Sequence, residues 1–109
     1  MIIDFDKTEE KVLPQFNGGE KEFNTRMFLD DLNKIQRGRL APGASIGMHT
    51  HVTNSEIIYI LEGEGTVLYD EGEESVEAGL CHYCPKGHAH SLINTGEKEL
   101  VFFAVVPVQ

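Results

Sequence analysis

The chain has 109 residues, which is enough for one globular domain with a buried core and too few for a second domain. Eighteen acidic residues against nine Lys and Arg give a formal charge of −9. This charge argues against binding to nucleic acid or to an anionic membrane surface, because both are polyanions that attract basic patches. Hydrophobic residues make up 40% of the chain and charged residues 25%, a mixture typical of globular rather than disordered proteins.

The first residues predict an N-terminal arm (1–22) ahead of a single domain (23–109), because they are polar and end in glycines. A short helix or turn fits residues 7–15, where Pro14 would end it early. An arm of this kind can also pair with a sheet edge, its own or a partner's. The chain starts without the basic and long apolar stretches of a signal peptide, and no apolar run has the length of a membrane span. We therefore expect a cytoplasmic protein.

From residue 23 onwards, short β-rich runs alternate with turns rich in Gly, Pro, Asn and Asp. The pattern predicts strands at residues 23–28, 34–40, 56–62, 65–69, 74–76, 80–84, 88–93 and 99–106. Strands at this spacing, without a convincing helical period, indicate an all-β sandwich or barrel.

The five histidines lie close together in the sequence, and four of them form two pairs. His49 and His51 are two residues apart, as are His88 and His90, so in an extended chain each pair points to one face. Glu56 leads into an apolar strand, where a carboxylate is costly to bury unless it is paired or bound to a metal. Any one of these histidines taken alone is more often a packed or surface residue. Together, imidazoles and a carboxylate favour a divalent first-row transition metal.

Two motifs make the chain resemble the cupin superfamily, in particular its small single-domain bacterial members. Residues 43–63 match G-x5-H-x-H-x4-E-x6-G, and residues 79–94 match G-x5-P-x-G-x2-H-x3-N, at every fixed position. Leu80 is a departure, since many members carry Asp in this turn. The resemblance implies the cupin double-stranded β-helix, an all-β jelly-roll barrel. It also implies four metal ligands, namely His49, His51, Glu56 and His90.

Other polar residues near these motifs are candidates for catalysis or substrate binding. His88 shares a strand face with His90, so it is a candidate acid–base or substrate-contact residue, although a hydrogen-bonded histidine beside the site is the simpler interpretation. Tyr59 is a second candidate catalytic residue. Arg37 and Arg39 share one strand face. They either bind an anionic substrate or, as the simpler interpretation, belong to a solvent-exposed face of the sheet.

The Cys81-His82-Tyr83-Cys84 segment contains a C-x-x-C pattern, which elsewhere indicates redox or zinc chemistry. Here the two cysteines lie three residues apart on an expected strand, so they point to opposite faces and cannot easily bridge or chelate one ion. We expect both to be small buried residues, and His82 to be a surface or structural residue.

A site of three histidines and one glutamate leaves positions open on an octahedral metal. We expect one divalent transition metal per chain, with Mn or Fe favoured over Zn, Ni or Cu. The resemblance favours an enzyme that acts on a small oxygen-bearing metabolite chelating this metal, as a dioxygenase, isomerase, decarboxylase or lyase. Two alternatives are a non-catalytic metal-dependent module that binds or senses a small molecule, and a barrel that holds metal only for stability.

Small cupins commonly dimerise, so we expect a homodimer with the arm and first strands at its interface.

Overall fold

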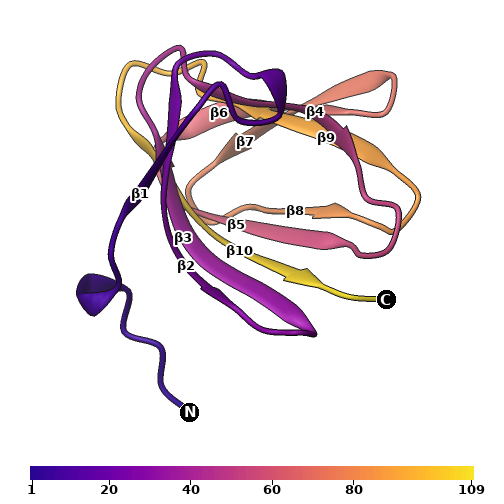
Figure 1. Cartoon of the computed structure of the whole chain (residues 1–109). Coiled ribbons are helices and arrows are strands. Elements are labelled where there is room, and N and C mark those ends of the chain that lie inside the picture. Colours follow the sequence, from indigo (N-terminus) through magenta and orange to yellow (C-terminus); the bar gives the residue numbers. More distant parts are fainter.

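Two antiparallel sheets face each other in the structure (Figure 1), a computed structural model that describes all 109 residues. The larger sheet has, in order, β1 (Lys11–Pro14), β2 (Glu22–Leu29), β3 (Asn33–Leu40), β10 (Leu100–Pro107), β5 (Glu56–Glu62) and β8 (Cys81–Cys84). The smaller sheet has β4 (Ser45–Thr50), β9 (Ala89–Ile93), β6 (Glu64–Tyr69) and β7 (Gly72–Glu77). Two short 3-10 helices, η1 (Phe5–Lys7) and η2 (Phe16–Gly18), lie near the N-terminus. This is the jelly-roll fold that the motifs imply.

All eight predicted strands are present, with their ends within two residues of the expected positions. Two further strands, β1 and β4, were not predicted. The prediction of a short helix within residues 7–15 is wrong for the residues of β1. This segment is extended and pairs antiparallel with β2. The pairing gives β1 backbone partners that a four-residue segment lacks on its own.

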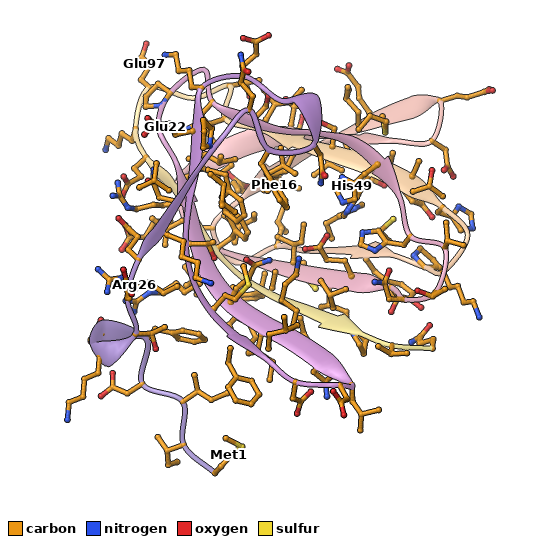
Figure 2. The ribbon with its side chains drawn as sticks, in the orientation of Figure 1. Met1, Phe16, Glu22, Arg26, His49 and Glu97 are labelled. Carbon is orange, nitrogen blue, oxygen red and sulfur yellow. The ribbon has the colours of Figure 1, made fainter.

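The N-terminal segment is fixed to the outer face of the larger sheet by three arginines (Figure 2 shows Arg26 beside it). Arg39 binds both carboxylate oxygens of Glu10, at 2.7 and 2.9 Å, and Arg37 binds Asp6 at 2.7 Å. Arg26 donates to the carbonyl oxygen of Thr8 at 2.7 Å. Ion pairs at such exposed positions contribute at most about 1 kcal/mol each. The arginines therefore hold the chain's own N-terminal segment and do not face the interior between the sheets.

The core between the sheets is apolar at one end. The rings of Phe23 and Phe102 stack with centroids 5.7 Å apart, and Leu40 and Leu100 are fully buried beside them. Strand alternation continues this core along β5, where Ile58 is buried while its neighbours are exposed. One contiguous cluster thus includes the buried Phe23, Leu40, Ile58, Leu100 and Phe102.

A β-bulge in β4 changes which side chains face the interior. Ile46 pairs with Leu92 and His49 with His90, so β4 advances three residues while β9 advances two. The extra residue lets Ile46 and His49 both face inward despite an odd separation. Gly47 lies in this bulge, directly beneath the backbone of η2, where a Cβ atom would collide with the carbonyl oxygen of Asn17.

The last residues of the chain close the loop between β4 and β5. Val108 forms an isolated bridge with Asn54, and the Gln109 N–H donates to the carbonyl oxygen of Thr53 at 2.9 Å. The C-terminus therefore lies at the same end of the barrel as this loop (Figure 1). None of the helices has the length and hydropathy that a membrane-spanning helix requires.

Candidate metal centre

The four residues expected as metal ligands come together from three strands. His49 lies near the end of β4, His51 directly follows this strand, Glu56 begins β5, and His90 lies in β9. Their ligand atoms all lie within 4.8 Å of one another. One carboxylate oxygen of Glu56 is 2.9 Å from His90 Nε2, 3.2 Å from His51 Nε2 and 3.9 Å from His49 Nε2. The cluster thus offers three nitrogens and one oxygen to a single point.

Each of the three imidazoles is oriented by a contact at its Nδ1 atom. His49 Nδ1 lies 2.8 Å from the carbonyl oxygen of Gly47, and His51 Nδ1 lies 2.6 Å from Asn54 Oδ1. His90 Nδ1 lies 3.0 Å from Nε2 of His82. These contacts leave all three Nε2 atoms facing the carboxylate. Such outer contacts fix the tautomer and direction of metal-binding histidines.

His82 links the cluster to Glu74. The His82 side chain is only 2% exposed, and its Nδ1 lies 3.0 Å from Glu74 Oε1. Burial, followed by the charge of His90, lowers the pKa of His82 despite the opposing effect of Glu74. A neutral His82 can accept a hydrogen bond from His90 through Nε2 and donate one to Glu74 through Nδ1. The sequence prediction left a surface or structural role open, and the structure supports the structural one.

The electrostatics of the cluster centre on the Glu56 carboxylate, whose side chain is 8% exposed. Burial raises the pKa of Glu56, but hydrogen bonds from the three histidines outweigh it and leave the pKa well below its ordinary value. The hydrogen bond to Glu56 in turn raises the pKa of His51. The Nε2 atoms of His51 and His90 are 3.0 Å apart. A buried anion with imidazole nitrogens converging on it fits a divalent transition-metal ion.

A cavity of about 390 Å³ opens onto the cluster and is lined by His49, His51 and Glu56. Its walls include apolar side chains from both sheets and Phe16 of η2. Figure 2 shows Phe16 and His49 in the space between the two sheets. A cavity of this size accommodates a small molecule next to the four side chains.

Neither candidate catalytic residue lines this cavity. His88 Nδ1 lies 2.7 Å from Asp70 Oδ2, and the His88 ring stacks on Tyr69 with centroids 5.6 Å apart. Tyr59 is 43% exposed on the face of β5 opposite Glu56. The structure therefore does not bring His88 or Tyr59 to the cavity, and their catalytic role stays a prediction.

Both cysteines are free, and they face opposite sides of β8 as the spacing requires. Cys84 is buried, and burial raises its pKa to about 11. Cys81 is exposed, so the expectation that both are buried is wrong for this residue. A thiol with a raised pKa is a poor nucleophile and metal ligand at neutral pH, so Cys84 acts as a small packing residue.

The chain shares sequence with curated proteins over part of its length. It is 44% identical over 71 residues to an oxalate-binding protein of Thermotoga maritima, a match that covers 64% of this chain and 58% of that protein. It is 36% identical over 64 residues to a glucose-6-phosphate isomerase of Thermococcus litoralis, covering 54% of this chain and 34% of that enzyme. The chain thus matches between about a third and three fifths of these relatives.

Solved structures match the whole chain. The structure of a predicted oxalate decarboxylase from Thermotoga maritima has a TM-score of 0.94 and 29% identity, with all of both chains covered. A sugar phosphate isomerase of Silicibacter pomeroyi has a TM-score of 0.81 at 20% identity, covering all of this chain and 76% of the other, a similarity of fold alone. The family model described as "Cupin domain" matches residues 36–106, about two thirds of the chain. The chain belongs to the cupin family.

Proposed function

We propose that the chain holds one divalent transition-metal ion through His49, His51, Glu56 and His90, and that this ion binds a small chelating oxygen ligand. The observation that carries the proposal is the convergence of three oriented Nε2 atoms on one buried carboxylate at the wall of a cavity. The ion would supply Lewis-acid attraction for oxygen donors. Mn and Fe remain the favoured metals, because imidazole and carboxylate together suit both.

Two observations support oxalate, or a dicarboxylate of similar size, as the ligand. A relative with 44% identity over 71 residues is named an oxalate-binding protein. The cavity of about 390 Å³ is a small space, and its walls mix apolar and polar groups. Oxalate presents two oxygens from adjacent carbons and so can chelate a metal with open positions.

Binding without turnover is the first candidate function, because the two residues expected to act in catalysis lie outside the cavity. An enzyme of the expected kind needs an acid–base group within reach of the ligand. Neither His88 nor Tyr59 is among the residues that line the cavity. Catalysis on the same ligand is the second candidate function, and the 29% identical structure of a predicted oxalate decarboxylase supports it. Decarboxylation would convert oxalate and one proton into formate and carbon dioxide.

The test is elemental analysis of untagged protein purified without chelators, beside a variant with both His49→Ala and His51→Ala. About one equivalent of Mn or Fe in the parent, lost in the double variant, is the expected result. Metal-loaded parent protein is then titrated with oxalate by calorimetry, and formate is assayed after incubation. Binding without formate supports the binding function, while formate release with many turnovers supports the enzyme. Absence of metal after reconstitution with either ion contradicts the metal site itself.

We also propose that the chain forms a homodimer, as its family resemblance suggests. The outer edge of β1 supports this, since β1 is the end strand of its sheet and its far side has no partner strand. Light scattering at micromolar concentration tests the proposal, and a mass of one chain would contradict it.

A further inference from the structure

A charged side chain outside the ligand set, that of Lys34, also lines the cavity. Lys34 lies on β3, where residues Gln36, Gly38 and Leu40 are buried and the intervening residues are more exposed. Side chains alternate along a strand, so Lys34 belongs to the inward face. The arginines of the same strand belong to the outer face and bind the N-terminal segment. Lys34 is therefore placed differently from its charged neighbours, on the side of the metal cluster.

The Lys34 ammonium group has no partner of opposite charge. It takes part in none of the ion pairs of the chain and donates no side-chain hydrogen bond, and its Nζ lies 6.0 Å from the centre of the Phe16 ring. The three arginines, by contrast, are all within ion-pair distance of a carboxylate. In a chain with twice as many acidic as basic residues, a half-buried lysine without a carboxylate is free to bind an anion.

The charges around the cavity also point to an anion. Lys34 and Glu56 are the only Lys, Arg, Asp or Glu residues that line it. With a divalent ion bound, Lys34 and Glu56 cancel each other and the cavity keeps a formal charge of about +2. A dianionic ligand would neutralise this charge.

We propose that Lys34 determines specificity by making the cavity select small dianionic chelators over chelators that carry less charge. The proposal rests on the proposed metal site, whose ion provides the chelation common to both kinds of ligand. Lys34 supplies a second, directional attraction for oxygens that the metal leaves free. Charged groups arranged in this way contribute to discrimination between ligands more than to total affinity.

The test is calorimetric titration of the Mn-loaded protein with two probes. Oxalate is a dianion that chelates through one oxygen of each carboxylate and keeps its other two oxygens free. Acetohydroxamate chelates as a monoanion through its carbonyl and N–O oxygens, and its methyl group offers no further oxygen. Lys34→Gln should weaken oxalate binding about tenfold and acetohydroxamate binding less than about twofold. Lys34→Arg should keep oxalate binding within about threefold, because it retains the charge. Lys7→Gln, at an exposed position of η1, removes the same charge outside the cavity and should change neither.

Metal uptake by each variant is measured first, and equal uptake shows that the fold and the cluster are retained. The role of Lys34 is overturned if Lys34→Gln binds oxalate as the parent does, or if it weakens both probes equally. If the parent takes up no metal or binds neither probe, the proposed function fails and the role of Lys34 fails with it. The two failures are thus distinguished by the parent protein alone.

Discussion

The two ends of the barrel interior are built from the same strands and differ in what they hold. On β5, Glu56 stands at one end and Ile60 towards the other, and on β9 His90 is followed two residues later by the buried Leu92. One end is an apolar core around Phe102, and the other is a polar cluster with a cavity. Stability and binding are therefore expected to be separable, because β5 and β9 each contribute to both ends through different residues.

The apolar end should control stability alone. Phe102→Ala is expected to lower the free energy of unfolding by about 3–5 kcal/mol, because it removes a fully buried ring stacked on Phe23. Urea unfolding measures the change. Metal affinity, measured where the variant is still folded, should stay near that of the parent. The neighbouring Phe103→Ala, on the opposite strand face, should cost only about 1 kcal/mol. A large loss of metal affinity in folded Phe102→Ala protein would show that the two ends are coupled.

The polar end should control metal binding with little effect on the fold. His90→Ala removes a nitrogen that lies 2.9 Å from the Glu56 carboxylate, so tight metal binding should be lost, by more than about a hundredfold. Circular dichroism should show unchanged β content. His88→Ala, two residues away and outside the cavity lining, is the matched control and should bind metal normally. Equal metal stoichiometry in the parent and His90→Ala would refute the ligand assignment.

A smaller loss of metal affinity is expected when His82, which contacts the proposed ligand His90, is replaced. His82→Phe removes the contact to His90 Nδ1 while keeping a ring of similar size, and should weaken metal binding about 10- to 100-fold. His82→Gln retains a side-chain oxygen that can accept a hydrogen bond and should recover part of the affinity. If both variants bind metal like the parent, His82 only fills space.

The smallest expected effect is a pH dependence of the metal-free protein. The pKa of His51 is raised above its ordinary 6.5, so its stabilising contribution is complete below pH 6.5 and is lost as pH rises through the folded-state pKa. His82, whose pKa is lowered, is neutral in both states above pH 6.5 and adds nothing there. The Tm of metal-free protein should therefore fall as the pH rises above 6.5. Glu56→Gln removes the carboxylate that raises the pKa of His51, so it should flatten the plot of Tm against pH. A flat plot for the metal-free parent protein would contradict the raised pKa of His51.

Metal-loaded protein should respond to pH in the opposite sense. Metal binding requires deprotonated imidazoles, so rising pH strengthens it and stabilises the loaded chain. The same cluster thus gives opposite slopes of Tm against pH with and without metal, and thermal scans of both forms compare them directly.

Much of the fold and the cluster of four residues could be predicted from the sequence. Glycines at turns and strand alternation indicated the sheets, and Gly43, Gly63, Gly79 and Gly87 all have the positive φ that such turns require. The two motifs placed His49, His51, Glu56 and His90 at spacings that the fold brings together. These signals are local, so a single sequence contains them.

What the sequence did not reveal depends on contacts between distant segments. The bulge in β4 is a matter of register against β9, and no residue of β4 specifies it alone. The contact of His82 with His90 needs two strands from different sheets. The residues that follow Lys34 in β3 do not alternate regularly between polar and apolar. The sequence alone therefore could not predict which side chains of β3 face the interior. Each of these features is set by tertiary packing, which overrides local pattern.

The contact between the chain's last residue and the loop after His51 has a practical consequence for protein engineering. Gln109 bonds to Thr53, and Thr53 and Asn54 line the cavity. Any peptide joined to Gln109 therefore begins next to the cavity mouth, where a polyhistidine tag would compete for the same ions. Met1 is 95% exposed at the far end of the N-terminal segment (Figure 1), so a purification tag or immobilising linker attached there should leave the proposed metal site accessible.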